Sequence, residues 1–248
     1  MSVATIAQPI LKPPAFAPHT RETEVIVYPE SDGKPMAEND PQYRCITDTR
    51  FALGQFFRDD ANVYLGADML VYYEEGDPTK SVAPDVFVVL GAPKGIRSNY
   101  QIWREGKAPD VVFEFASPGT WRADLGWKMG LYQGLGVREY LLFDPLDAYF
   151  TPLLQGYRLT GRRYEAIPTL RGERGRLGVR SEALSLEIWA QPHHEPGMPF
   201  VLRLFHPQHQ TWLRTPDEEA DARREAERQV ADLAAEIERL RAQLSGAA

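Results

Sequence analysis

The sequence has little of three features that define common protein classes. Cys45 is the only cysteine among 248 residues, so the chain can form no intramolecular disulfide and no cysteine cluster for zinc or iron–sulfur. No stretch approaches the roughly 20 apolar residues that a membrane helix needs. The first twenty residues lack the basic start and apolar run of a signal peptide. We therefore expect a cytoplasmic protein without membrane association.

Positive charge is also scarce. Lys and Arg total 28 against 35 Asp and Glu, which gives a formal net charge of −7. This excludes a global basic field, so an anionic partner such as DNA would have to meet a local patch. Two stretches are candidates for contacts to phosphates and bases, although arginines in hairpins are equally typical of an ordinary solvated face. They contain Arg158, Arg162, Arg163, Arg171, Arg174, Arg176 and Arg180, and Lys94, Arg97, Arg104 and Lys107 with Tyr100 and Trp103 between them.

Hydrophobic patterning predicts an α/β protein with a parallel or mixed sheet. The expected helices cover 45–57 and 122–135, and the expected strands cover 62–65, 69–73, 84–90, 111–116 and 140–143. Residues 149–190 resemble a string of hairpin strands, and Trp127 and Tyr140 are predicted core residues. The domain division is an irregular arm over 1–24, a main domain over 25–190, a Pro- and His-rich linker over 191–216 and a helix over 217–244.

The last segment has the pattern of a coiled coil. From Asp217 to Leu244 there is no Gly or Pro, and apolar residues recur at alternating steps of three and four. They are Val230, Leu233, Ile237, Leu240 and Leu244. We expect a helix that forms a homodimer, with folding back onto its own domain as the alternative.

Two charged residues interrupt apolar patterns. Alternation along the strand over 111–116 places Glu114 on one face with Val112 and Ala116. A carboxylate in that setting needs a cation, hydrogen bonds or a metal. Helical spacing places Lys128 on the face that should pack on the sheet, and we expect it to reach back toward Glu114 and Asp85.

Two carboxylates and one lysine at strand ends can hold a divalent metal and prepare a water for attack on a phosphodiester. Other interpretations stay open. Asp85, which follows Pro84, could merely cap a turn, and Glu114 and Lys128 could form a structural salt bridge.

These residues carry a resemblance to a known family. Pro84-Asp85, then 108–120 around Glu114, then Lys128 with Tyr132, then 136–145 occur in order and resemble the Uma-two family of proposed restriction endonucleases, within the PD-(D/E)XK nuclease superfamily. The similarity covers roughly residues 25–190. It implies a restriction-endonuclease-like fold, with a mixed central sheet flanked by helices, and Mg²⁺-dependent hydrolysis of DNA, with Mn²⁺ as a substitute.

The resemblance also implies roles for individual residues. Asp85 and Glu114 would hold the metal, and Lys128 would orient or activate the attacking water. The superfamily pattern has a lysine two residues after the acid, where this chain has Ala116, so the lysine is assigned to the following helix. An acidic residue on the N-terminal helix often completes such sites, and Glu38 either fills this role or is a solvated glutamate before a helix.

Asp110 is a second candidate for the aspartate, on the same face as Glu114. It lies two strand repeats away, roughly 13 Å at about 3.3 Å per residue, so Asp85 is preferred. The resulting prediction is a metal-dependent endonuclease that cleaves DNA. The alternative is a catalytically inactive DNA-binding or dimeric interaction module that retains the fold.

Overall fold

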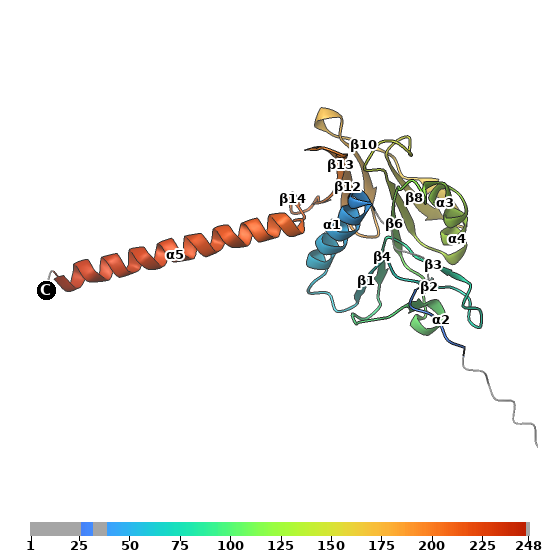
Figure 1. Cartoon of the computed structure of the whole chain (residues 1–248), viewed down its shortest axis with the longest axis horizontal. Coiled ribbons are helices and arrows are strands. Elements are labelled where there is room, and N and C mark those ends of the chain that lie inside the picture. Colours follow the sequence, from blue (N-terminus) through green and yellow to red (C-terminus); the bar gives the residue numbers. More distant parts are fainter. Residues whose placement is uncertain (1–25, 32–38, 247–248) are drawn as a thin grey trace, which may run out of the picture.

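A six-stranded sheet forms the centre of the protein. The computed structural model describes residues 26–31 and 39–246 (Figure 1). The sheet has the order β1-β4-β6-β7-β8-β9, in which β6 and β7 are parallel and the other neighbours are antiparallel. Its strands are β1 (Val63–Ala67), β4 (Val86–Leu90), β6 (Val111–Phe115), β7 (Glu139–Phe143), β8 (Leu154–Thr160) and β9 (Arg163–Ala166). The predicted mixed α/β architecture is confirmed.

Two smaller sheets complete the β-structure. A three-stranded sheet has the order β3-β2-β5, and a five-stranded antiparallel sheet has the order β10-β11-β12-β13-β14. The strands are β2 (Val71–Tyr72), β3 (Ser81–Val82), β5 (Tyr100–Gln101), β10 (Leu170–Arg171), β11 (Leu177–Ser181), β12 (Leu186–Glu195), β13 (Met198–His206) and β14 (Thr211–Trp212).

The five-stranded sheet occupies much of the expected linker. Apart from the turn at 196–197, residues 191–206 lie in β12 and β13, which pair along most of their length. Leu202 and Leu204 of β13 are buried against the core. The prolines and histidines of this stretch hid an alternation of apolar and polar residues, so the segment is structural rather than a linker. The wider division of the chain into domains stays a prediction.

The helices lie on both faces of the central sheet and beyond it. α1 (Asp40–Phe56) begins earlier than expected, because the Asn39 side chain accepts a 2.9 Å hydrogen bond from the backbone of Gln42 and Pro41 occupies the first turn. The expected helix over 122–135 is two helices, divided at Gly126. The remaining helical elements are α2 (Ile102–Glu105), α3 (Trp121–Leu125), α4 (Trp127–Leu135), the 3₁₀ turn η1 (Glu173–Gly175) and α5 (Pro216–Gly246).

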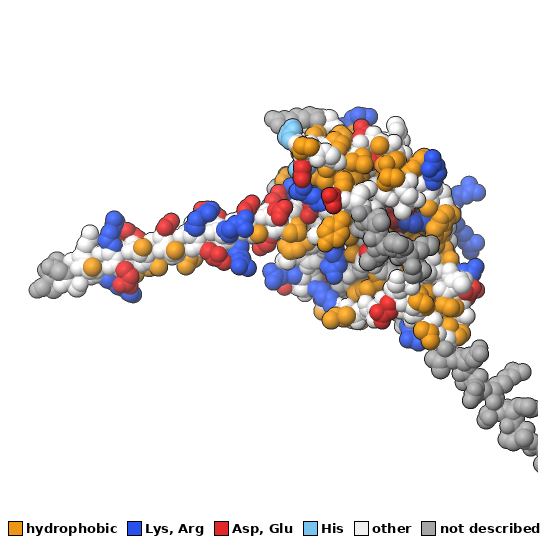
Figure 2. Space-filling model, viewed as in Figure 1, with side chains coloured by type: hydrophobic (Ala, Val, Ile, Leu, Met, Phe, Trp, Pro, Cys, Tyr) orange, Lys and Arg blue, Asp and Glu red, His pale blue; other side chains and the backbone are white. Residues whose placement is uncertain are grey.

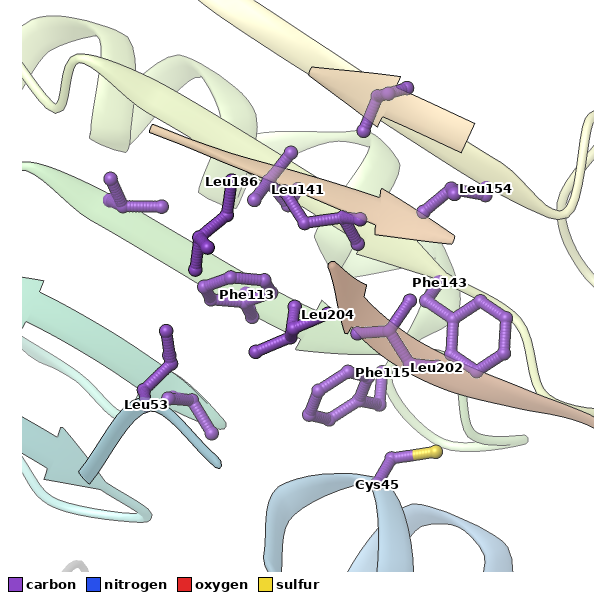
Figure 3. Close-up of a cluster of buried hydrophobic side chains, with 14 of the residues drawn as sticks. Cys45, Leu53, Phe113, Phe115, Leu141, Phe143, Leu154, Leu186, Leu202 and Leu204 are labelled. Atoms are coloured by element: carbon purple, nitrogen blue, oxygen red, sulfur yellow. The ribbon is translucent and has the colours of Figure 1, made fainter. Parts of the chain in front are cut away.

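The central sheet separates two buried clusters. Val111, Phe113 and Phe115 point into the first cluster, together with residues of α1 and the five-stranded sheet (Figure 3). Val112 and Ala116 belong to the second cluster, with Tyr132 and Tyr140. This confirms the predicted alternation of β6, and it directs Glu114 toward the face that α3 and α4 cover.

α5 extends away from the rest of the protein (Figure 1). Its first turn is fixed to the body, because Arg203 of β13 makes two hydrogen bonds to Glu218, at 2.8 and 2.9 Å. The Glu218 side chain also accepts a 3.0 Å hydrogen bond from the backbone of Thr215. Over the described ranges, no helix combines the length and apolar character needed to cross a membrane.

Candidate active site

Strand pairing brings Asp85 beside Glu114. β4 and β6 are antiparallel with Val86 opposite Phe113, so the residue before β4 comes opposite the residue after Phe113. Asp85 is fixed there by a 2.6 Å hydrogen bond from the backbone N–H of Phe115 to Oδ2. Gln42 of α1 donates from Nε2 to Oδ1 at 3.3 Å. Asp85 therefore belongs to this cluster and does not merely cap a turn.

Glu114 is held by two side chains of α4. Its side chain is 1% exposed, and it accepts hydrogen bonds from Lys128 Nζ to Oε2 at 2.8 Å and from the Tyr132 hydroxyl to Oε1 at 2.7 Å. Lys128 and Tyr132 are four residues apart, so both project from one face of the helix. The structure brings together Asp85, Glu114 and Lys128, as the sequence predicts.

A third carboxylate completes the cluster. Asp124 of α3 is fully buried, and its Oδ1 lies 2.9 Å from Lys128 Nζ. Neither of its carboxylate oxygens has a hydrogen bond of good geometry from the part of the chain that the structure describes. Three buried or partly buried carboxylates thus share one ammonium group, which leaves a local excess of negative charge.

Burial and the neighbouring charges shift the pKa values of these groups. Burial raises the pKa of Glu114 to about 7, against the opposing effect of Lys128. Burial, and then the charge of Glu114, raise the pKa of Asp85 well above its usual value, and burial also raises the pKa of Asp124. Burial opposes the charge of Lys128, but the surrounding carboxylates outweigh it and raise its pKa. Lys128 is therefore an ammonium group at neutral pH, which donates hydrogen bonds and cannot take a proton from water.

A break between α3 and α4 sets the direction of Lys128. A Cβ atom at Gly126 would lie 2.8 Å from the carbonyl oxygen of Arg122, so a larger residue would not fit. The break leaves Trp127 exposed while Lys128, the next residue, is buried. The prediction that Trp127 lies in the core is wrong, since 57% of it is exposed, whereas Tyr140 is buried as predicted.

Aromatic and basic side chains lie on α3 and on the loop after β7. The rings of Trp121 and Tyr149 stack with centroids 6.0 Å apart, and the Arg122 guanidinium lies 4.3 Å from the Trp121 ring centre. Asp144 holds this loop by accepting hydrogen bonds from the backbone N–H groups of 146, 148, 149 and 150. Ala116, at the end of β6, donates to the carbonyl of Phe143 at 2.9 Å, which places the loop at the Glu114 end of the sheet.

Asp110 lies at the opposite end of β6 and does not join the cluster. Its Oδ2 accepts from the backbone of Leu90 at 2.7 Å and lies 2.7 Å from Lys107 Nζ. Leu90 ends β4, while Asp85 precedes its first residue. Glu38, the other expected acid, lies outside the described residues.

Much of the predicted basic surface is engaged within the protein. Arg97 pairs with Glu105 at 2.7 Å, and Lys94 donates to the carbonyls of Phe57 and Arg58. In the arginine-rich stretch, Arg158 pairs with the buried Glu139 and with Glu182. These cations have structural roles, so contact with DNA through them stays a prediction.

The carboxylates suit a hard divalent cation that keeps other ligands. No group of three His, Cys, Asp or Glu side chains placed to hold a metal occurs in the described residues. Mg²⁺, however, is commonly held by one or two carboxylates, with water and substrate phosphate as further ligands. Asp85 and Glu114 each accept two hydrogen bonds, and a carboxylate has about four lone-pair positions. Burial, and then the charge of Glu114, raise the pKa of Asp85, and a cation bound beside it would favour the ionised carboxylate. The two residues therefore fit such an ion.

Fold and cluster together define a mixed α/β protein with a buried carboxylate–lysine site at strand ends. Comparison with protein families matches residues 34–190, well over half of the chain, to Uma2, described as "Putative restriction endonuclease". The chain belongs to the Uma2 family, which confirms the resemblance seen in the sequence.

Other comparisons add little. No protein of curated function matches the chain. Among solved structures, a "putative nuclease belonging to DUF820" from Anabaena variabilis ATCC 29413 is 17% identical, with a TM-score of 0.41 over 54% of this chain and 70% of that one. This likeness is too distant to support conclusions about the site.

Sequence reasoning did not assign Gln42 or Asp124 to the site. Both carry a signal that could have identified them. Gln42 is a polar residue on the same helical face as Cys45, Ile46 and Thr49, all of which are buried. Asp124 precedes Lys128 by four residues, the spacing of a helical ion pair.

Proposed function

We propose that the protein is a metal-dependent endonuclease that hydrolyses DNA phosphodiester bonds. The observation that carries this proposal is the excess of carboxylate over ammonium among Asp85, Glu114, Asp124 and Lys128. Such an excess of buried carboxylates lowers the stability of a fold. Metal-assisted hydrolysis of a phosphodiester, however, requires carboxylates that are free to hold a cation.

Asp85 and Glu114 would hold Mg²⁺, or Mn²⁺ in its place. Bound there, the cation would polarise a phosphate oxygen and lower the pKa of a bound water. Gln42 and the backbone of Phe115 fix the Asp85 carboxylate, and Tyr132 fixes that of Glu114. These contacts limit the movement of both carboxylates before substrate arrives.

Lys128 would orient the attacking water and stabilise negative charge that develops on the phosphate. Since its pKa is raised, the ammonium donates hydrogen bonds and does not act as a base. The water oxygen would form a bond to phosphorus as the opposite P–O bond breaks. The proton of the water would pass to solvent, and the departing oxygen would take a proton from solvent. Asp124 would act as a positioning residue that keeps the ammonium over the site.

The order of elements supports a restriction-endonuclease-like fold. Helix α1 is followed by the antiparallel strands β1, β4 and β6, and α4 then leads to β7 parallel to β6. This is a mixed sheet flanked by helices, as the family resemblance implies. Trp121, Arg122 and the exposed Trp127 supply aromatic and cationic groups for contact with DNA beside the site.

Cleavage of DNA with variants at Lys128 tests the function. We expect the protein to nick or cleave duplex DNA with Mg²⁺ or Mn²⁺, and Lys128→Ala to reduce the rate by at least about 100-fold. Arg239→Ala is the matched control, since Arg239 is an exposed cation on α5 that pairs with Glu236 of the same helix, away from the site. Equal cleavage by Lys128→Ala and the wild type would show that the assignment is wrong.

Titration with Mn²⁺ separates the enzyme from the non-catalytic module. We expect calorimetric heat of binding in the wild type and its loss in Glu114→Gln. A protein that binds DNA with a strong salt dependence, without binding Mn²⁺ and without cleavage, would be the inactive module instead.

A further inference from the structure

α5 carries an apolar stripe that the rest of the chain leaves uncovered. The four residues of the stripe are between 47% and 66% exposed: Val230, Leu233, Ile237 and Leu240. Figure 2 shows hydrophobic side chains along the part of the helix that lies beyond the body. Four large aliphatic side chains at steps of three and four on a solvated helix are typical of an interface.

We propose that α5 pairs with the α5 of a second copy of this chain as a parallel, two-stranded coiled coil. In the heptad notation abcdefg, Val230 and Ile237 occupy a, and Leu233 and Leu240 occupy d. β-branched residues at a with leucine at d favour two parallel strands over trimers and tetramers. The stripe thus fits two helices rather than three or four.

The charges that flank the stripe favour the parallel orientation. Glu236 occupies a g position and Arg241 the following e position, so each Glu236 meets Arg241 of the other copy in a parallel pair. In the antiparallel alignment Arg241 still meets Glu227, but the two Glu236 side chains face each other at the centre. Within one helix Arg241 pairs with Glu238, and Glu236 pairs with Arg239. Exposed ion pairs of this kind contribute little to stability, so replacing them with pairs between the two helices costs little.

The base of the helix determines where the two bodies lie. Arg203 and Glu218 tie the first turn of α5 to β13, with Arg214 and Glu219 paired at 3.0 Å beside them. A parallel coiled coil therefore places both bodies at one end of the assembly. This proposal stands whether or not the buried cluster is a nuclease site.

Mass measurement with a charged variant tests the pairing. At tens of micromolar we expect light scattering to give twice the chain mass of 28.1 kDa. Leu233→Glu should raise the dimer dissociation constant by at least about 100-fold, because it buries a charge in the seam of both helices. Ala235→Glu, on the outer face, is the matched control and should leave the dimer intact. A monomer, a trimer or tetramer, or a dimer that survives Leu233→Glu would overturn the proposal.

Cysteine cross-linking tests the orientation. Ala226 occupies a d position, so Ala226→Cys should form a disulfide between copies when diamide, a thiol oxidant, is added. Ala231→Cys, on the outer face, should not, and the native Cys45 is only 2% exposed and does not compete. A dimer in which Ala226→Cys fails to cross-link would be antiparallel, which also contradicts the proposal.

Discussion

The two ends of β6 and β7 both bury carboxylates but balance them differently. At the end where the strands begin, Glu139 accepts from Arg158 at 3.0 Å, from Ser181, and from the backbone of Glu182 at 2.9 Å. At the end where β6 finishes, three carboxylates share Lys128. Burial alone therefore does not mark a functional site. What indicates a functional site is a cluster of carboxylates with too few hydrogen-bond donors. A fold that needed only stability would supply each of these carboxylates with donors.

The largest expected effects come from replacing one buried glutamate at each end of the two strands. Glu114→Gln should reduce metal-dependent DNA cleavage by about 10³-fold while the protein stays folded. Glu139→Ala should reduce the free energy of unfolding by about 3 kcal/mol, because it leaves Ser181 and the backbone N–H groups of Glu182 and Ala183 without their acceptor. Cleavage assays per folded molecule, combined with urea denaturation, measure both. The comparison fails if Glu139→Ala also abolishes cleavage in its folded fraction.

Metal binding should stabilise the folded protein, and this gain should depend on the carboxylates at one end of β6 only. Mg²⁺ at about 100 times its dissociation constant should raise the free energy of unfolding by about 2.7 kcal/mol. Asp85→Asn should remove this gain, while Asp110→Asn, at the other end of β6, should keep it even if its starting stability is lower. Thermal unfolding with and without Mg²⁺ measures the difference, and an equal gain in both variants would place the ion elsewhere.

The metal-free protein should lose stability as the pH rises from about 4.5 to about 7. Burial raises the pKa of Glu114 to about 7 from an ordinary value of 4.5, so in this window the folded state binds a proton that the unfolded state releases. The free energy of unfolding then falls with pH by at most about 1.4 kcal/mol per unit for this group. The raised pKa values of Asp85 and Asp124 act in the same direction. Glu114→Gln should flatten the curve in urea titrations, and an unchanged slope in that variant would contradict this origin.

The smallest expected effect concerns the exposed cation beside Asp110. Arg138 lies 3.7 Å from Asp110, with 58% of its side chain exposed. Arg138→Ala should change the free energy of unfolding by no more than about 0.5 kcal/mol. A loss above about 2 kcal/mol would mean that this end depends on the number of its cations rather than on its hydrogen bonds.

The sequence predicted the strand pattern and three members of the cluster. Alternation assigned the faces of β6 correctly, and helical spacing directed Lys128 toward Glu114. Both are local rules, and here the tertiary structure obeys them. The role of Gln42 was beyond such rules, because it depends on how α1 packs against a strand 43 residues away.

Two other differences have identifiable physical causes. The stretch over 191–206 forms strands because apolar residues of β12 and β13 meet across a sheet, despite a composition typical of a linker. The exposure of Trp127 follows from the break at Gly126, and the helical spacing of apolar residues over 122–135 does not predict that break. Secondary-structure propensity describes one segment at a time, whereas the strands over 191–206 and the exposure of Trp127 depend on how segments pack against each other.

The placement of Lys128 on a helix has a consequence for finding such proteins. The ammonium group lies 2.8 Å from the Glu114 carboxylate, while the strand position two residues after Glu114 is Ala116. A search for an acid and a lysine at fixed sequence spacing would pass over this chain. A search for the three-dimensional arrangement of one ammonium group and the surrounding carboxylates, whichever backbone carries them, would detect it.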